Sequence, residues 1–291
     1  MKKTSLILGC GDIGTALGQQ LIEAGHRVVG VRRHPQSLQG SGIEPLALDI
    51  NGEGALRALP DADIVVYVAS ADHFEESAYR AAYRDGLGAV LAELGRREHK
   101  PTRVFFVSST SVYAQQNGER VDEAAETRPA GFSGQLMREA EQALITHDLP
   151  GSVVRFSGIY GPGRDRLIRQ VREGRIAAAT PPMYSNRIHR DDCAGVLAHL
   201  THMALAGEPL DDVYLASDCE PAPLHEVMAW LARRLGVESS ETIQAPLRRR
   251  ASKRCDNTRL CATGYRFRYP TFREGYAQVL ASEGRVEPEK A

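Results

Sequence analysis

The sequence has few of the residues that build disulfide frameworks, metal centres or membrane spans. Its five cysteines are odd in number, scattered and never arranged as C-x-x-C, and its nine histidines form no H-x-H or H-x-x-x-H pair. No apolar run approaches the roughly 18 residues that cross a bilayer, and the chain enters an apolar segment too early for a signal peptide. We therefore expect a protein of the reducing cytoplasm, with no bound metal and no membrane partner.

Charge of either sign is not in excess. The 36 basic and 37 acidic side chains give a formal net charge of −1, which excludes a global field for nucleic acid. The local exception is Leu247–Arg254, where five positive charges fall within the seven residues from Arg248. This run lacks the interleaved aromatic residues typical of single-stranded nucleic-acid binding. It is interpreted either as a contact to the phosphates of a nucleotide-linked substrate or as a solvated loop.

A glycine motif near the N-terminus is the most informative feature that the sequence does contain. The apolar run Leu6–Leu8 leads into G-x-G-x-x-G, and an amphipathic segment with apolar residues at four-residue spacing follows. In this strand-turn-helix context, the motif predicts a turn that binds the pyrophosphate of a dinucleotide at a helix N-terminus. The alternative is a glycine-rich turn without a ligand. The residues assigned to the turn are Gly9, Gly11, Asp12, Ile13 and Gly14.

The end of the second predicted strand, at residues 27–31, indicates which dinucleotide is bound. Sites specific for NAD usually place an acidic residue about 20 residues beyond the glycines, on the ribose 2′-hydroxyl. Here Arg32 and Arg33 take that place. A guanidinium binds a 2′-phosphate through paired hydrogen bonds, so NADP(H) is the predicted cofactor and NAD(H) the alternative. Two arginines that are merely solvated would give no such preference.

Strand-like and helical segments continue to alternate along the chain. The apolar runs are 45–48, 64–69, 104–107 and 152–156, and the helical patterns between them are 76–94 and 136–146. This alternation predicts an α/β fold of the Rossmann type, a doubly wound parallel sheet covered on both faces. We expect residues 1–156 to form the dinucleotide-binding domain. Residues 157–291 should mainly form a smaller C-terminal substrate lobe, with some segments returning to the sheet.

Four further motifs follow one another along the chain. They are Ser108–Tyr113 (S-S-T-S-V-Y), Arg155–Gly163 (R-x-x-x-x-Y-G-P-G), Ile188–Asp192 (I-H-R-D-D) and Tyr269–Gly275 (Y-P-T-F-R-E-G). Together they resemble the extended short-chain dehydrogenase/reductases, the NAD(P)-dependent epimerase/dehydratase family, over nearly the whole chain. The family often has G-x-x-G-x-x-G at the first turn, and its first glycine would be Leu8 here.

The resemblance implies further contacts to the cofactor. Asp49 and Ile50 follow the third strand and would flank the adenine, whereas Ala69 and Ser70 follow the fourth strand and would pass beneath the nicotinamide-side ribose. Ligands of such sheets lie beyond the carboxyl ends of the strands, where these residues fall. For Asp49, the alternative is a plain turn residue.

The chain departs from the family in the residues of the reaction itself. The family's acid/base is the tyrosine of a Y-x-x-x-K motif, whose phenol the lysine activates. Alignment on the family's downstream glutamate, at Glu141, puts Ser133 and Met137 at these two positions, and residues 101–252 contain no lysine. A serine hydroxyl without a charged or basic partner is not poised for proton transfer. The chain is therefore similar to the atypical branch of the superfamily, which lacks the pair.

Three hydroxyl groups remain as candidates for catalysis. Ser109 occupies the family's serine position, where a hydroxyl polarises the substrate oxygen. Tyr113 and Tyr160 would present a phenol to the nicotinamide, although tyrosines in such motifs commonly pack and bond to the backbone. His189 is a further candidate proton donor, with capping of the Asp191–Asp192 turn as its alternative.

Two functions follow from these observations. The first is an NADP(H)-dependent oxidoreductase or epimerase-like enzyme, acting with non-standard proton delivery on a small or nucleotide-linked carbonyl or sugar substrate. The second is a non-catalytic NADP(H)-binding redox sensor or regulator, which the missing tyrosine–lysine pair favours. The resemblance also suggests a homodimer through the two predicted helices. Five apolar residues suit that interface and equally suit the core of a single chain: Tyr79, Tyr83, Leu87, Val90 and Leu94.

Overall fold

The computed structural model describes residues 2–243, 252–282 and 284. Its chain divides into two compact units, each built from several segments. Unit 1 comprises residues 1–112, 127–155 and 194–214, and unit 2 comprises residues 113–126, 156–193 and 215–291. The sequence predicts one main boundary after residue 156. In the structure, segments of the two units alternate along the chain, and one of the changes falls between residues 155 and 156.

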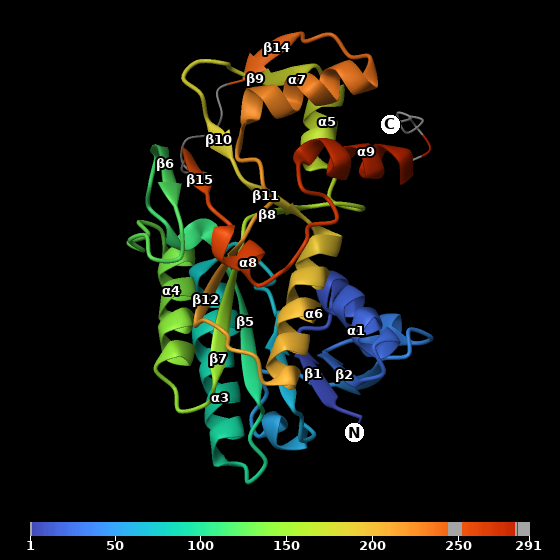
Figure 1. Ribbon diagram of the computed structural model, residues 1–291, viewed down its shortest axis with the longest axis vertical. Coiled ribbons are helices and arrows are strands. Elements are labelled where there is room, and N and C mark those ends of the chain that lie inside the picture. The colour runs from blue at the N-terminus through green and yellow to red at the C-terminus, as the bar shows by residue number, and fades with distance from the viewer. Residues whose placement is uncertain (1, 244–251, 283, 285–291) are drawn as a thin grey trace. The chain divides into compact units, whose positions relative to one another are not determined.

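A seven-stranded sheet, whose strands lie wholly or partly in unit 1, confirms the predicted Rossmann-type α/β fold (Figure 1). Its strands are β1 (Thr4–Leu8), β2 (Arg27–Arg32), β3 (Glu44–Ala47), β4 (Ile64–Tyr67), β5 (Arg103–Ser109), β7 (Gly151–Phe156) and β12 (Val213–Ala216). They are ordered β12-β7-β5-β4-β1-β2-β3, and β1 pairs in parallel with both β2 and β4. The chain order reverses beside β1. In open α/β sheets, ligands bind at such a reversal, beyond the carboxyl ends of the strands.

Helices cover both faces of this sheet. They are α1 (Asp12–Glu23), α2 (Glu76–Tyr79), α3 (Gly86–Arg96), α4 (Phe132–Ile145) and α6 (Arg190–Ala206), with 3₁₀ turns at Pro35–Leu38, Ala55–Ala58 and Thr110–Val112. Figure 1 shows α3 and α4 on one side of the strands and α1 and α6 on the other. The helix predicted over 76–94 is present as α2, a π-helical segment (Arg80–Asp85) and α3 in direct succession.

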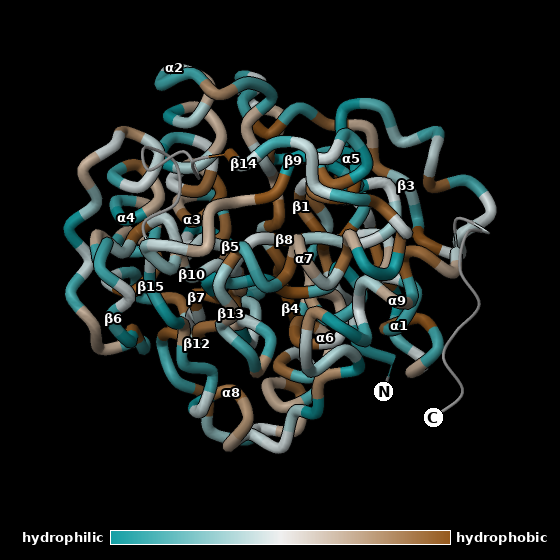
Figure 2. Tube along the Cα trace, turned by 90° about the horizontal axis from the view of Figure 1, so that it is seen from above, coloured by the Kyte–Doolittle hydropathy of each residue, from teal (hydrophilic) through white to brown (hydrophobic). Residues whose placement is uncertain are grey.

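Burial on both faces explains why the strands are continuously apolar in sequence. Every residue of β4 is buried, and so are residues Ser5–Leu8 of β1. A parallel strand between two helical layers has no solvent side. Hydrophobic residues accordingly concentrate along strands such as β4 and β7, whereas α2 is mainly hydrophilic (Figure 2). The apolar face predicted for the helix over 76–94 also lies in this core, through Tyr83, Leu87, Val90 and Leu94.

Unit 2 is made of shorter elements around a core of its own. Its strands are β6 (Asn117–Val121), β8 (Gly158–Tyr160), β9 (Arg175–Ala177), β10 (Tyr184–Ser185), β11 (Arg187–His189), β13 (Ala222–Pro223), β14 (Glu241–Ile243) and β15 (Ser252–Cys255). Its helices are α5 (Arg166–Arg172), α7 (Leu224–Leu235), α8 (Thr258–Ala262) and α9 (Phe272–Ser282). The strands pair as β6 with β15, β8 with β11, β9 with β14 and β10 with β13. Buried apolar residues of α5, α7 and α9, such as Val171, Leu231 and Leu280, form the core.

Candidate functional site

Close approach of the backbone explains two glycines of the turn between β1 and α1. Gly9 has a positive φ of 84°, and its N–H donates to the Val31 carbonyl oxygen at 3.0 Å. A Cβ at this position would overlap the backbone of Ala69, so no side chain fits. A Cβ at Gly14 would lie 3.0 Å from Ile7 Cγ2, which is the tight helix–strand packing predicted for the third glycine.

Gly11 differs from these two glycines because packing does not require it. A Cβ there would meet only the Gly9 carbonyl oxygen, at 3.8 Å. Gly11 is the N-cap of α1 and, as a glycine, has no side chain that could cap the first N–H groups of the helix. Such donors, together with the positive end of the helix dipole, attract an anion. The absence of a side chain at this position would let a pyrophosphate approach the backbone closely.

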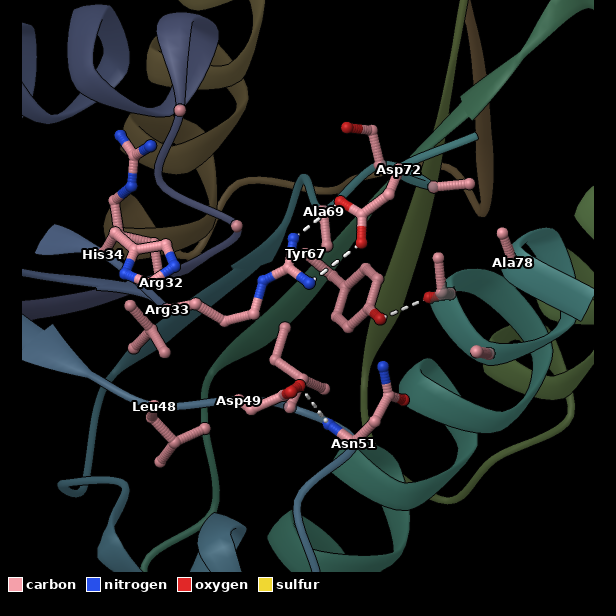
Figure 3. Close-up of a pocket in the computed structure, with 18 residues that line it drawn as sticks. Arg32, Arg33, His34, Leu48, Asp49, Asn51, Tyr67, Ala69, Asp72 and Ala78 are labelled. Atoms are coloured by element: carbon pink, nitrogen blue, oxygen red, sulfur yellow. Dashed lines mark hydrogen bonds and ion pairs between the residues drawn. The ribbon is translucent and has the colours of Figure 1, made fainter. Parts of the chain in front are cut away.

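A pocket of about 280 Å³ opens at the carboxyl ends of β1, β2 and β4, entirely within unit 1 (Figure 3). The segment after β3 and the helical stretch from α2 complete its walls. Most of the cofactor residues predicted from the sequence line it: Gly9, Gly11, Arg32, Arg33, Asp49, Ile50, Ala69 and Ser70. The other three, Asp12, Ile13 and Gly14, form the first turn of α1. The binding role of all these residues stays a prediction.

The two arginines at the end of β2 point in different directions (Figure 3). Arg32 turns toward the glycine turn, where its guanidinium donates to the Cys10 carbonyl oxygen at 3.3 Å and to Ser37 Oγ at 2.7 Å. Arg33 extends to Asp72, on the loop after β4, and its two Nη atoms donate to the two carboxylate oxygens at 2.8 and 2.6 Å. The arginines thus have separate partners, and Arg32 is the one beside the glycine turn.

Two carboxylates accompany these guanidinium groups at the pocket. The hydrogen bonds between Arg33 and Asp72 lower the pKa of the Asp72 carboxyl and raise the pKa of Arg33. Both side chains are about half exposed, 54% and 53%, so solvent screens the pair and keeps it weak. Asp49 Oδ1 accepts the Asn51 N–H at 3.0 Å and closes the turn after β3. That contact is the turn role named above as the alternative for Asp49.

Sequence reasoning did not identify several other residues of the pocket. Asp72 is 39 residues away from Arg33, and no local pattern links the two. The Tyr67 hydroxyl donates to the Ala82 carbonyl oxygen, which ties β4 to the helical stretch after it. The alanines at 78, 81 and 82 line the wall at i, i+3 and i+4 spacing, a pattern visible in the sequence. The remaining unpredicted residues include His34, Leu48 and Asn51.

Ser109 is the last residue of β5, and a network of buried side chains holds the end of that strand. The residue is partly exposed, and its Oγ accepts the Ser111 N–H at 3.1 Å. Ser108 Oγ donates to Glu141 Oε1 at 2.6 Å, and Arg155 donates to both oxygens of the same carboxylate at 2.8 and 2.7 Å. These three side chains are buried, and they tie the end of β5 to α4 and β7. The network fixes the backbone that carries the Ser109 hydroxyl.

The start of α4 holds the two residues aligned with the family's tyrosine and lysine. Ser133 is partly exposed in the first turn, and Met137, one turn later, is buried. A thioether carries no charge, so it does not lower the pKa of a neighbouring hydroxyl. Phe132 packs against Phe74 and Tyr79, with ring centroids 5.1 and 5.5 Å apart. An aromatic cluster therefore lies where α4 begins.

The two candidate tyrosines belong to unit 2 and are buried. The Tyr113 hydroxyl donates to the Asp122 carbonyl oxygen at 2.7 Å. Tyr160 stacks on Tyr276 with ring centroids 4.5 Å apart, and burial raises the pKa of its phenol. Its hydroxyl lies so close to Gly275 that a Cβ there would overlap it. These contacts are packing contacts, and the catalytic roles of both tyrosines stay predictions.

The I-H-R-D-D motif connects two parts of unit 2. His189 is fully buried, its Nδ1 accepts the Asp191 N–H at 3.2 Å, and burial lowers its pKa. This is the capping geometry given above as the alternative for the histidine. The Asp192 carboxylate accepts the backbone N–H groups of Arg268 and Tyr269 at 2.7 and 3.0 Å. The motif therefore binds the start of the Y-P-T-F-R-E-G segment.

Most of the basic run, residues 247–251, lies outside the described residues. Its last part belongs to β15, which pairs with β6. Lys253 is buried there, and burial lowers its pKa. Arg254 donates through Nε to the Gly118 carbonyl oxygen at 2.7 Å. The described end of the run is therefore part of a strand.

Within the described ranges, no three or more His, Cys, Asp and Glu side chains are grouped as a metal ion would need. None of the helices in the part of the chain described here has both the length and the apolar character to cross a membrane.

Comparisons with known proteins agree with this architecture. The model of the NAD dependent epimerase/dehydratase family matches residues 5–202. The chain belongs to this family. A provisionally assigned NAD-dependent epimerase/dehydratase from Methylobacillus flagellatus is 34% identical, with a TM-score of 0.81, and the match covers 98% of this chain and 100% of that chain. Comparison with curated proteins gives no match.

More distant structures of the epimerase type share the fold. The human epimerase family protein SDR39U1, solved with NADPH, is 19% identical, with a TM-score of 0.78 and coverage of 96% of this chain and 99% of that chain. MoeE5, solved with UDP-glucuronic acid and NAD, is 20% identical, with a TM-score of 0.80 and coverage of 97% and 99%. At these identities the likeness extends to the fold and not to a particular ligand.

Proposed function

We propose that this family member binds a nicotinamide dinucleotide in the pocket of unit 1, with NADP(H) preferred over NAD(H). The observation that carries the proposal is that one pocket collects Gly9 and Gly11 of the glycine turn together with Arg32 at the end of β2. Bound NADPH in one structural neighbour and bound NAD in another support a nicotinamide cofactor. The arginine in place of an acidic residue supports the 2′-phosphate.

The residues present fit such a cofactor. The N–H groups at the start of α1 would bind the pyrophosphate. Arg32 would bind the 2′-phosphate first, because its guanidinium already lies beside the glycine turn. Arg33 would join it on release from Asp72. The cofactor supplies the hydride chemistry, and the chain supplies orientation and charge.

We infer an oxidoreductase or epimerase-like activity on a small or nucleotide-linked carbonyl or sugar substrate. Family membership supports this activity, and so does Ser109, a partly exposed residue at a strand end that the buried network holds in place. In this role, Ser109 Oγ donates to the substrate oxygen and stabilises the charge that develops there. Proton delivery then comes from a group other than the tyrosine–lysine pair.

The second candidate is a non-catalytic NADP(H)-binding redox sensor. It is favoured by Ser133 and by the buried Met137, which offer neither a phenol nor an ammonium. Turnover separates the two candidates. NADPH is incubated with UDP-sugars and with small aldehydes, and its absorbance is followed for wild type and for Ser109→Ala. Turnover that falls in the variant supports the enzyme, whereas tight cofactor binding without turnover in either protein supports the sensor.

Calorimetry with NADPH and NADH tests the cofactor proposal directly. Arg32→Ala should weaken NADPH binding by about 10- to 100-fold, since hydrogen bonds to charged groups contribute roughly 1.5–3 kcal/mol. Arg27→Ala is the matched control, because Arg27 begins the same strand and pairs with Glu44 outside the pocket. Equal affinity of wild type for the two nucleotides would refute the phosphate contact, and no heat with either would refute the site.

A homodimer also remains a proposal. The apolar face of α3 is buried within unit 1, so an interface would have to use its exposed side. Ala89 and Ala92 lie on that side, and small residues permit close helix packing. Sedimentation of wild type and Ala92→Arg tests it: a dimer that the arginine dissociates supports the proposal, and a monomeric wild type refutes it.

A further inference from the structure

Two cysteines far apart in the sequence meet at one amide in unit 2. Cys219 lies in the loop after β12, and Cys261 lies in α8. Asn257 Nδ2 donates to Cys219 Sγ at 3.4 Å, and Cys261 Sγ donates to Asn257 Oδ1 at 3.5 Å. Both sulfur atoms therefore contact the same side-chain amide.

Backbone hydrogen bonds hold both thiols at this place. The Cys219 N–H donates to the Pro270 carbonyl oxygen at 2.8 Å, and the Cys261 N–H donates to the Asn257 carbonyl oxygen at 3.0 Å. Asn257 Nδ2 donates in addition to the Ser217 carbonyl oxygen at 2.9 Å. Asn257, at the start of α8, is thus bonded to the loop at Ser217 and at Cys219, which holds the two cysteines on either side of one amide.

Cys219 and Cys261 are also the two cysteines that are accessible to solvent. Cys219 is exposed and Cys261 is partly exposed, whereas Cys10, Cys193 and Cys255 are buried. Burial raises the pKa of Cys10 to about 11 and that of Cys255 to about 12, and both thiols are shielded from solvent. Burial also raises the pKa of the partly exposed Cys261, which lowers its thiolate fraction. An oxidant in solution therefore reaches Cys219 first.

We propose that Cys219 and Cys261 form a reversible redox site, a dithiol that closes to a disulfide by exchange with a low-molecular-weight disulfide such as oxidised glutathione. The Cys219 thiolate attacks one sulfur of the oxidant, forms a mixed disulfide and expels one glutathione thiolate. The Cys261 thiolate then attacks the Cys219 sulfur and releases the second glutathione. The protein loses two electrons and two protons, and the oxidant is reduced to two thiols.

Closure would link α8 covalently to the loop after β12. That loop is part of the framework of unit 2, because the Asp218 N–H donates to the carbonyl oxygen of Arg187 in β11 at 2.7 Å. A cross-link lowers the conformational entropy of the unfolded chain and thereby stabilises the folded state. The oxidised protein should therefore unfold at a higher temperature than the reduced protein, and a reductant should reverse the shift.

The test uses the full chain, reduced and then equilibrated at increasing ratios of oxidised to reduced glutathione. Free thiols are alkylated, and peptides are mapped by mass spectrometry. We expect wild type to lose two of its five thiols and to yield one peptide pair linked through 219 and 261. Cys261→Ser should stop at a glutathione adduct on Cys219, and Cys219→Ser should form neither product. Cys255→Ser is the control and should behave as wild type.

Other outcomes would overturn the proposal. A wild type that accumulates the glutathione adduct on Cys219 without the internal link would show that the side chains do not reach disulfide geometry. A link between two chains, or to one of the buried cysteines, would contradict the assigned pair. Phenylarsine oxide, which bridges neighbouring thiols, gives a second measurement. Failure to protect both thiols from alkylation in wild type would show that they are not neighbours in solution.

Discussion

Replacing Asp72 with asparagine should tighten the binding of NADPH without changing the binding of NADH. In the structure, the Asp72 carboxylate occupies both Nη atoms of Arg33, at 2.8 and 2.6 Å. A 2′-phosphate that takes up Arg33 has to displace this carboxylate first. Both side chains are about half exposed, so the pair contributes roughly 0.2–1 kcal/mol. Its removal therefore corresponds to a gain of about 1.4- to 5-fold in the affinity for NADPH.

Calorimetric titration of wild type and Asp72→Asn with both nucleotides measures this effect. Asparagine keeps the shape of the side chain and removes its charge. Asp85→Asn is the matched control, since Asp85 forms a similarly exposed pair with Arg84 and does not line this pocket. Weaker NADPH binding in Asp72→Asn would refute the reasoning, because it would mean that Asp72 orients Arg33 toward the phosphate. An equal change for NADH would refute it as well, since NADH carries no 2′-phosphate.

Three further predictions concern the turn, the buried network and pH. Gly11→Ala should weaken NADPH binding about tenfold, or 1.4 kcal/mol, although the added Cβ meets no atom of the protein closer than 3.8 Å; unchanged affinity would contradict the close approach. Glu141→Ala should lower the free energy of unfolding in urea by about 3–5 kcal/mol, because the buried charge of Arg155 loses this carboxylate; a loss below about 1 kcal/mol would contradict this. Burial raises the pKa of Asp218 from 3.8 to about 8. The folded state thus holds a proton that the unfolded state releases in this pH range, so stability falls as pH rises through it. Asp218→Asn should therefore raise the thermal midpoint, relative to wild type, more at pH 8 than at pH 5; the same difference at both pH values would contradict the assignment.

The features that depend on neighbouring residues were predictable from the sequence. The positive φ of Gly9 and the tight packing of Gly14 against Ile7 both arise within one strand, its turn and the next helix, and the motif spacing reports them. The continuous apolar character of residues 64–67 reflects a strand buried on both faces, which is a property of a parallel sheet. The fold class follows from such local signals because a βα unit packs mainly against its neighbours in sequence.

Contacts between distant residues were not predictable in the same way. Nothing near Arg33 in the sequence indicates that Asp72 will pair with it. The pair nevertheless matters for binding, because a ligand that contacts Arg33 has to displace the Asp72 carboxylate. Cys219 and Cys261 read as scattered cysteines and meet only because α8 lies against the loop after β12. Such contacts depend on how loops close, and loop closure leaves no periodic pattern in the sequence.

The contacts among the family motifs show that these motifs have a structural role, which does not require catalysis. The I-H-R-D-D motif binds the Y-P-T-F-R-E-G segment through Asp192, and the Y-G-P-G tyrosine, Tyr160, packs its hydroxyl against Gly275 of that segment. These motifs therefore contact one another within unit 2, and packing is sufficient reason for their presence. A sensor that never turns over would need them as much as an enzyme. The case for catalysis consequently depends on Ser109, which makes none of these contacts, and the turnover of Ser109→Ala is the measurement that bears on it most directly.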